Sequence, residues 1–338
     1  MKSILVTGCN GFIGRHLTAA LLARGFAVRG VDRTERSDAP VDRFEFVNAD
    51  LTGETAAAGC MNGIDTVIHL AAIPREDRSK TWADFESVNI TATRRLLEAA
   101  QNAGVKRFVF ISTVEAAGFG NGRAPRSEED TPAPVNNYGK SKLAAELVVR
   151  EPHWTIERVI IRLPMIYGPG TDLIDAKLFG MVRRRLYPLI GNGSTLMEFC
   201  YVENAVHGII LAAEHPAAAG ELFYLSDERS YSIREVITAV AGGVGVRILF
   251  ISLPVPIAYA LATLWETAAK LIPVPPLIMP ASKKPFFSRE TVWWTTHNVN
   301  IVSTEKITRM LGYKASVPID EGCRRTAAWL AARRTTKG

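Results

Sequence analysis

Along the first 165 residues, short apolar runs alternate with longer stretches in which apolar positions recur at helical spacing. The pattern predicts strands at 3–7, 26–31, 44–48, 65–70, 105–111 and 156–163, and helices at 12–24, 82–102 and 136–150. This alternation is typical of a parallel sheet whose right-handed crossovers place helices on both faces. The sequence therefore predicts an α/β fold with a doubly wound parallel sheet.

The rest of the chain contains more proline, tryptophan and irregular apolar runs. We expect most of it to form a smaller C-terminal cap over the edge at which the strands end. We expect residues 199–213 and 222–226 to return a helix and a strand to the sheet. The predicted boundaries are 1–166 plus 199–227 for the sheet domain and 167–198 plus 228–338 for the cap.

The cap contains an unusual apolar segment at 248–280. No charged residue occurs between Ile248 and Leu264, but Pro254 and Pro256 interrupt the run. A membrane-spanning helix needs about 20 apolar residues, and prolines near its middle need compensation by neighbouring helices. Two interpretations remain: buried cap helices, or a hydrophobic flap that admits a lipophilic substrate and touches a bilayer.

Charge and cysteine content narrow the class of protein. The 338 residues carry a net charge of +6, but the basic residues are spread out and accompany no nucleic-acid-binding motif. Solvated surface charge is the simplest explanation, and attraction to an anionic membrane is the alternative. The four cysteines form no C-x-x-C pair, so neither a disulfide framework nor a metal site is expected. The N-terminus enters a strand directly, and we expect a cytoplasmic protein, with peripheral membrane contact as an option.

A glycine-rich turn follows the first strand. The apolar run Ile4–Val6 leads into Gly8, Gly11 and Gly14 and then into a helix. Gly8 permits a tight turn, Gly11 the approach of a phosphate, and Gly14 the close packing of helix on strand. Such a helix N-terminus presents N–H groups and a positive dipole end to a pyrophosphate. The residues expected to bind it are Gly8, Asn10, Gly11, Phe12, Ile13 and Gly14.

Carboxylates at the ends of the next two strands suggest which dinucleotide binds. Asp32 lies 18 residues past Gly14, where a carboxylate accepts the adenosine ribose hydroxyls and repels a 2′-phosphate. This favours NAD. Arg33 could instead pair with such a phosphate, so NADP is the less favoured alternative. We expect Asp50 and Leu51 near the adenine, although Asp50 by itself better suits a loop carboxylate or a helix cap than a ligand.

Candidate catalytic groups follow later strands. Tyr138 and Lys142 are four residues apart at the start of a predicted helix and share one face. An ammonium near a phenol favours the phenolate, so Tyr138 could exchange a proton with a substrate oxygen while Lys142 holds the nicotinamide ribose. Thr113 ends a strand and could bind the reacting carbonyl. Glu115 is either a polar rim residue or a substrate contact, and Asn89 needs a polar partner on the sheet side of its helix.

The motifs that carry a family resemblance are Thr7–Gly14, His69–Ala72, Asn89, Ser112-Thr113, Tyr138-x-x-x-Lys142 and Arg162–Gly170. Together they resemble the extended short-chain dehydrogenases/reductases of the NAD-dependent epimerase/dehydratase superfamily. The resemblance implies a Rossmann sheet, bound NAD and a triad of Thr113, Tyr138 and Lys142. It also implies a homodimer formed through the helices that bear Asn89 and Tyr138. Further cofactor contacts implied are Leu70, Ala71, Ala72, Asn89, Ser112, Tyr138, Lys142, Pro164 and Ile166.

Departures from the nucleotide-sugar branch of this family indicate another substrate. Met165 stands where that branch usually has Asn, Met197-Glu198 where it has an arginine for the diphosphate, and Val114 where dehydratases have an acid. The stretch 191–208 and the proline-interrupted cap resemble the 3β-hydroxysteroid dehydrogenase branch, especially sterol-4α-carboxylate 3-dehydrogenases (decarboxylating). The residues expected to contact substrate are Ile73, Glu115, Met165, Met197 and Tyr201.

These observations support three hypotheses. The first is an NAD(P)-dependent oxidoreductase acting on a secondary alcohol or ketone of a lipophilic, steroid- or terpenoid-like molecule, including oxidative decarboxylation of a 4-carboxysterol. The second keeps the fold but acts on a nucleotide sugar as a 4-epimerase or reductase. The third is a non-catalytic NAD-binding regulatory protein, which the intact Tyr138/Lys142 pair disfavours.

Overall fold

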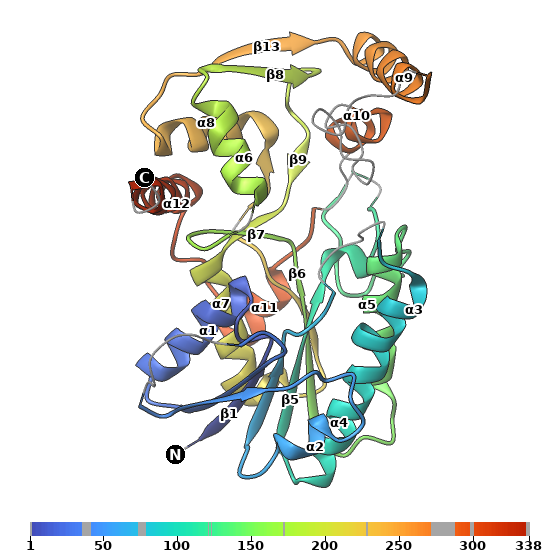
Figure 1. The fold of residues 1–338 in the computed structure, drawn as a ribbon, viewed down its shortest axis with the longest axis vertical. Helices are drawn as coiled ribbons and strands as arrows, with labels where there is room; N and C mark the ends of the chain where they lie inside the picture. Colours follow the sequence, from blue (N-terminus) through green and yellow to red (C-terminus); the bar gives the residue numbers. More distant parts are fainter. Residues whose placement is uncertain are drawn as a thin grey trace.

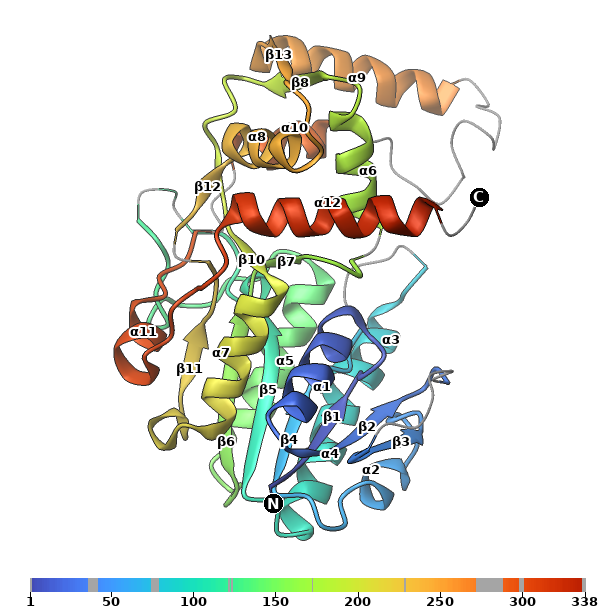
Figure 2. The ribbon, with the colours of Figure 1, turned by 90° about the vertical axis from the view of Figure 1, so that its left-hand side faces the viewer.

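A seven-stranded sheet forms the lower half of the molecule (Figures 1 and 2), in the order β3-β2-β1-β4-β5-β6-β11. Every neighbouring pair in it is parallel, which confirms the predicted fold class. The computed structural model describes residues 2–35, 42–73, 79–120, 122, 124–171, 173–227, 229–271, 288–297 and 301–335. The strands are β1 (Ser3–Thr7), β2 (Ala27–Asp32), β3 (Phe44–Asn48), β4 (Thr66–His69), β5 (Arg107–Thr113), β6 (Glu157–Leu163) and β11 (Leu222–Tyr224).

Helices cover both faces of the sheet because the central strands are apolar on both sides. One face packs against α1 (Phe12–Ala23), α7 (Val202–Glu214) and α11 (Glu305–Leu311). The other packs against α2 (Ala56–Gly59), α4 (Ala92–Asn102) and α5 (Asn137–Arg150). The strand and helix expected to return to the sheet are β11 and α7. The three layers form a Rossmann architecture.

The strand order places the switch point of the sheet between β1 and β4. Thr7, the last residue of β1, lies opposite Val31 on one side and His69 on the other. The carboxyl ends of β1, β2, β4 and β5 therefore meet at one edge. Ligands of open α/β sheets bind at this edge, next to the switch point.

The helix predicted at 82–102 is interrupted. The structure has α3 (Trp82–Phe85), a π-helical segment (Glu86–Thr91) and then α4. Thr81 caps α3 through a reciprocal pair of hydrogen bonds with Asp84. π-Helical turns are rare and often accompany functional sites, and this one carries Asn89.

The cap forms the upper half of the molecule in both views. The links β7 (Met165–Tyr167) and β10 (Phe199–Tyr201) pair in parallel between the two halves. Its other elements are α6 (Leu173–Val182), β8 (Leu186–Ile190), β9 (Leu196–Met197), β12 (Tyr231–Ser232), α8 (Ile233–Gly243), β13 (Leu249–Leu253), α9 (Val255–Leu271), α10 (Arg289–Thr296) and α12 (Ile319–Thr335). Short 3₁₀ turns follow β5 (Val114–Ala116) and α7 (Pro216–Ala218).

One segment assigned by sequence to the cap packs elsewhere. Ile307 and Leu311 of α11, with Tyr313, belong to the apolar core of the sheet domain. The apolar segment expected at 248–280 forms β13 and α9, while 272–280 lie outside the described residues. Among the described helices, none combines the length and apolar character needed to cross a bilayer.

Candidate active site

The glycine turn between β1 and α1 leaves no room for side chains. Gly8 adopts a φ of +69°, and its N–H donates to the Val31 carbonyl at 2.8 Å. A Cβ on Gly14 would lie 2.1 Å from the Gly8 carbonyl oxygen, which is backbone and cannot move aside. Gly14 therefore fixes how closely α1 approaches β1, and this closeness aims the helix N-terminus at the switch point.

The N-terminus of α1 suits a pyrophosphate. Gly11 occupies the N-cap position, and among the described residues no side chain caps this helix or places an acid in its first turn. The first-turn amides and the positive dipole end thus remain for an anion. Phe12 packs edge-on against His16 at 5.6 Å, and His16 bonds the Pro169 carbonyl at 2.7 Å, which ties the turn to the cap link. Ile13 is half-buried beside them.

Asp32 organises the turn from the end of β2. Its two carboxylate oxygens accept the backbone N–H groups of Asn10 (3.1 Å) and Thr34 (3.0 Å). The Asn10 side chain donates to the Thr34 carbonyl at 2.6 Å, so the two loops are bonded together. Arg33 is exposed directly beside Asp32. This placement fits an adenosine ribose, whose hydroxyls can donate to the same carboxylate.

The other carboxylate expected near the adenine is engaged locally. Asp50 accepts the backbone N–H of Thr52 at 3.0 Å and its hydroxyl at 2.8 Å. These hydrogen bonds lower the pKa of Asp50. The structure therefore shows the loop-stabilising role that was the alternative for this residue. Leu51, next to it, is buried in the core.

A chain of hydrogen bonds supports the backbone after β4. Thr7 Oγ1 accepts the Ala71 N–H at 3.1 Å and lies 2.7 Å from His69 Nδ1. His69 Nε2 lies 2.9 Å from Thr93 Oγ1, which itself donates to the Asn89 carbonyl at 2.7 Å. Thr93 must therefore accept from Nε2–H, which assigns the tautomer. Burial lowers the pKa of His69 to about 3, so the ring is neutral and holds the segment Leu70–Ile73 in place.

Asn89 joins that segment to the helix of the candidate tyrosine. Its side-chain oxygen accepts the Ile73 N–H at 2.8 Å, and its amide donates to Ser141 Oγ at 2.9 Å. Ser141 Oγ in turn donates to the Tyr138 carbonyl at 2.8 Å. The buried Asn89 thus satisfies its polar groups by positioning two loops and a helix turn.

Thr113 and Tyr138, which carry the candidate catalytic hydroxyls, lie at the end of β5 and at the start of α5. Thr113 Oγ1 accepts the Glu115 N–H at 3.3 Å, and Asn136 donates to the Glu115 carboxylate at 2.7 Å. Asn136 also caps α5 by accepting the Gly139 N–H at 2.7 Å. A Cβ on Gly139 would lie 2.4 Å from the Glu115 carbonyl oxygen. This contact presses the start of α5, with half-buried Tyr138, onto the end of β5.

Lys142 lies one turn beyond Tyr138 on α5 and is only 2% exposed. Its Nζ sits 4.0 Å from the centroid of the Phe110 ring. Burial lowers the pKa of Lys142 to about 7, although the Glu146 carboxylate acts in the opposite direction. A lysine with this pKa changes its charge near neutral pH, which suits a group that tunes a neighbouring phenol.

A buried ion pair lies behind these residues, and the sequence analysis did not identify its acid. Glu146 accepts Arg162 Nη2 at 2.7 Å and Nε at 2.9 Å, and Ser112 Oγ donates to the same carboxylate at 2.5 Å. Arg162 Nη1 also donates to Tyr224 Oη at 2.9 Å. Ser112, expected at the cofactor, is thus a partner of Glu146. The i, i+4 spacing of Lys142 and Glu146 on one helix face was the available signal.

The expected substrate residues separate into exposed and buried ones. Met165 on β7 is exposed and lies with Ile166 on a link between the two halves, and Met197 on β9 of the cap is half-buried. Glu198 is buried and bonds Ser230 Oγ and, at 3.3 Å, the Val302 N–H. Pro164 and Ile73 are half-buried next to the strand ends.

Tyr201 does not fit the position expected for it. Its side chain is 0% exposed, its ring packs against Tyr167 at 5.4 Å, and its hydroxyl donates to Glu203 at 3.4 Å. Burial is the main cause that raises the pKa of Tyr201 to about 12. Gly322 of α12 packs closely on the Tyr201 ring, so a substrate could reach this phenol only if β10 and α12 separated. Tyr201 is therefore not a substrate contact in this structure.

The family is shown by comparison with known proteins. The model of the NAD dependent epimerase/dehydratase family matches residues 4–225. The chain belongs to this family. It is 28% identical to mouse sterol-4-alpha-carboxylate 3-dehydrogenase, decarboxylating, over 96% of this chain and 90% of that one. It is 31% identical to the 3 beta-hydroxysteroid dehydrogenase/Delta 5-->4-isomerase of Mycobacterium tuberculosis (strain CDC 1551 / Oshkosh), over 72% of this chain and 70% of that protein.

Solved structures show the same fold. MoeE5 in complex with UDP-glucuronic acid and NAD superposes with a TM-score of 0.74 and 26% identity, over 98% of this chain and 99% of that chain. These comparisons confirm the predicted family and the predicted NAD-dependent enzyme acting on hydroxyl groups. The relatives also include the sterol and steroid dehydrogenases that the sequence resembles. The individual site residues stay predictions.

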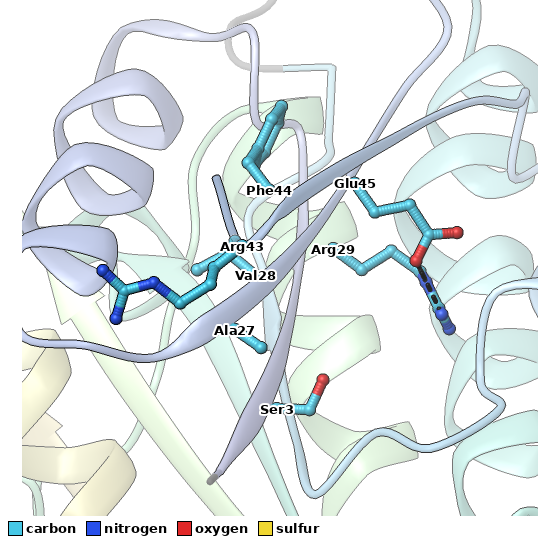
Figure 3. Close-up of a pocket in the computed structure, with 7 residues that line it drawn as sticks. All are labelled: Ser3, Ala27, Val28, Arg29, Arg43, Phe44 and Glu45. Carbon is cyan, nitrogen blue, oxygen red and sulfur yellow. Dashed lines mark hydrogen bonds and ion pairs between the residues drawn. The ribbon is translucent and has the colours of Figure 1, made fainter. Parts of the chain in front are cut away.

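The family's cofactor edge is distinct from a hollow at the opposite edge of the sheet. That hollow, of about 290 Å³, is shown in Figure 3. Ser3, Ala27 and Phe44 line it and are the first residues of their strands, so it opens at the amino edge. Arg29 and Glu45 lie together on one side of it and pair at 2.7 Å. With its charges paired, the hollow has no role in the site described above.

Proposed function

We propose that this protein is an NAD-dependent dehydrogenase that interconverts a secondary alcohol and a ketone on a lipophilic, steroid- or terpenoid-like molecule. The observation that carries the proposal is that α5, which bears Tyr138 and Lys142, begins against the segment that follows Thr113 at the carboxyl end of β5. The similarity to a sterol dehydrogenase over nearly the whole chain supports the same substrate class.

The chain's own groups would handle the substrate oxygen and its proton. Thr113 would donate a hydrogen bond to that oxygen, and Tyr138 would take the proton in oxidation and return it in reduction. Lys142, charged in part near neutral pH, would favour the phenolate form of Tyr138. NAD, when bound, supplies the two-electron oxidant.

The cofactor would lie along the switch point. We assign the pyrophosphate to the turn Gly8–Gly14 and the adenosine ribose to Asp32. Leu70–Ala72 would line the phosphate and ribose side of the cofactor, and Pro164 and Ile166 would border the nicotinamide. Asn89 and Ser112 act through other residues, since their polar atoms bond Ile73, Ser141 and Glu146. They are positioning residues.

An apolar substrate fits the side chains that border the cap. Met197 on β9 is half-buried, while its neighbour Glu198 is buried and bonded to Ser230. Met165 and Met197 would offer polarizable, apolar contacts and no cation for a diphosphate. If the substrate carries a carboxylate beside the alcohol, its oxidation gives a β-keto acid, which loses CO₂ readily.

A nucleotide-sugar 4-epimerase or reductase is the second candidate. The similarity to MoeE5 bound to UDP-glucuronic acid, which covers nearly the whole chain, favours it. The absence of an arginine at positions 197 and 198 argues against it. The two candidates differ in what the cap must bind: apolar rings or a diphosphate.

The decisive experiment measures NADH formation by the purified protein on a panel of 3β-hydroxysteroids and 4-carboxysterols and on UDP-hexoses. We expect turnover on the lipophilic alcohols, and loss of that turnover with retained NAD binding in Tyr138→Phe, typically by ~10²–10⁴-fold. Turnover on UDP-hexoses alone would favour the second candidate. NAD binding without turnover on either panel would favour a non-catalytic role.

We also propose a homodimer and a cytoplasmic location. Leu147 on α5 is 59% exposed, on a helix that packs beside α4 and carries Tyr138. The family resemblance implies an interface through these helices, and such an interface would remove Leu147 from water. Light scattering after size-exclusion chromatography should give a dimer for the wild type and a monomer for Leu147→Glu. A monomeric wild type would contradict the homodimer.

A further inference from the structure

The far end of the cap carries an apolar surface that the proposed reaction does not use. β8 and β13 form a parallel two-stranded ribbon there, followed by α9 (Figures 1 and 2). We call this surface the cap face. Its side chains are between 46% and 67% exposed: Leu186, Leu249, Ile251, Ile257, Leu261, Leu264 and Trp265.

The ribbon contributes one side of the cap face by strand alternation. Leu249 lies opposite Leu186, and Ile251 opposite Pro188, and all four are exposed. Phe250, between them in sequence, points inward and packs on the Arg234 guanidinium at 4.6 Å. The pleat therefore places apolar residues on the solvent side, where an antiparallel or ribbon surface normally carries polar ones.

The helix contributes a second apolar stripe. Ile257, Leu261, Leu264 and Trp265 follow the i, i+4, i+7, i+8 spacing of one helical face. The neighbouring stripe, Ala258 and Ala262, is buried against Val292 of α10. The stripe of larger residues faces solvent, because each of its four side chains is at least 46% exposed.

Basic residues border the cap face. Arg183, Arg184 and Arg185 precede β8, and Arg247 precedes β13, all exposed. The Leu249 N–H donates to the Arg185 carbonyl at 2.9 Å, which brings both basic segments to the same end of the ribbon. No aspartate or glutamate occurs at 183–197 or at 236–265. In the described part of the chain, no ion pair involves these four arginines.

We propose that the cap face docks on the surface of an anionic lipid bilayer. Apolar side chains would enter the boundary between headgroups and acyl chains, Trp265 would lie at the headgroup level, and the arginines would contact lipid phosphates. A second copy of the chain fits less well, because a two-fold contact would place both arginine borders around one interface. The proposal does not depend on the substrate.

Vesicle flotation of the full purified chain tests the proposal. The probes are vesicles of phosphatidylcholine alone and of phosphatidylcholine mixed with phosphatidylserine. We expect the wild type to float with the anionic vesicles, more weakly with the neutral ones, and less as salt is added. Leu261→Gln combined with Leu264→Gln should bind about ten-fold or more weakly.

Two further variants separate apolarity, charge and folding. Leu261→Met with Leu264→Met keeps the apolar area and should float like the wild type. Arg183→Gln with Arg184→Gln should lose the preference for anionic vesicles. Each variant should keep the wild-type unfolding temperature, since the changed side chains are exposed. Any of three results would overturn the proposal. The wild type could float with neither kind of vesicle, or the variant with Leu261→Gln and Leu264→Gln could float like the wild type. The third is that the wild type forms an oligomer that this variant, but not the Met variant, dissociates.

Discussion

Glu146 and Arg162 form a fully buried ion pair at 2.7 Å, one helical turn from Lys142. Removing one partner of such a pair leaves an uncompensated buried charge, which typically costs about 3–5 kcal/mol. We therefore expect Glu146→Gln to lower the free energy of unfolding by that amount, measured by denaturant titration. The pair joins α5 to β6, so the lysine's helix should loosen as well.

A surface pair on the same helix provides the control. Glu151, at the end of α5, pairs with Arg94 on a partly exposed surface. Exposed pairs contribute about 0–1 kcal/mol. Glu151→Gln should therefore change the unfolding free energy far less than Glu146→Gln. Equal losses in the two variants would contradict a special role for the buried pair.

The lowered pKa of Lys142, about 7, predicts how stability varies with pH. Above pH ~7 the folded state has released this proton, while an unfolded lysine holds it up to pH ~10.4. Since the unfolded state then binds more protons, Lys142 makes the free energy of unfolding rise with pH in this window and has no effect on the slope below it. Lys142→Met should lack this rise.

The measurement is the difference in unfolding free energy between wild type and Lys142→Met, determined at several pH values. Taking the difference removes the contributions of other titrating groups. Lys140→Met serves as the control, because Lys140 is exposed on the same helix. A difference that stays constant from pH ~6 to ~10 would show that the Lys142 ammonium is not penalised by burial.

Local patterns were sufficient for most strands and helices of the sheet domain. The strand and helix around the glycine turn, predicted at 3–7 and 12–24, correspond to β1 and α1. The break in the helix predicted at 82–102 was not predictable, because it depends on Asn89 bonding Ile73 and Ser141 from distant segments. The ribbon of β8 and β13 likewise pairs residues about 60 positions apart, which periodicity cannot reveal.

The candidate site shows the same division. The sequence spacing placed Tyr138 and Lys142 on one helix face, and the structure keeps them there. Spacing does not determine which partner a polar side chain meets across the fold. Asp50 is occupied by Thr52, Ser112 by Glu146, and the chain through His69 needs Thr7 and Thr93 from separate elements.

Gly14 should be irreplaceable even by alanine. The added Cβ would lie 2.1 Å from the Gly8 carbonyl oxygen and 2.8 Å from the Cys9 Cα, so α1 would have to move away from β1. We expect Gly14→Ala to abolish NAD binding in a calorimetric titration and to lower the unfolding temperature. Gly180 lies within α6 with nothing near its Cβ position, so Gly180→Ala should bind NAD normally and gain about 0.5–1 kcal/mol. Normal binding by Gly14→Ala would show that α1 can shift without harm.

Asp32 should decide between NAD and NADP. Its carboxylate holds the Asn10 and Thr34 amides and would accept the ribose hydroxyls, a type of charge-assisted bond that contributes about 1.5–3 kcal/mol. Asp32→Asn removes this charge and its repulsion of a 2′-phosphate, while exposed Arg33 remains to attract one. The ratio of kcat/KM for NADP to that for NAD should therefore rise about 10–100-fold. Asp50→Asn is the matched control, because the Asp50 carboxylate is bonded to Thr52. If Asp50→Asn shifts the ratio and Asp32→Asn does not, the adenosine ribose lies beside β3 rather than at the end of β2.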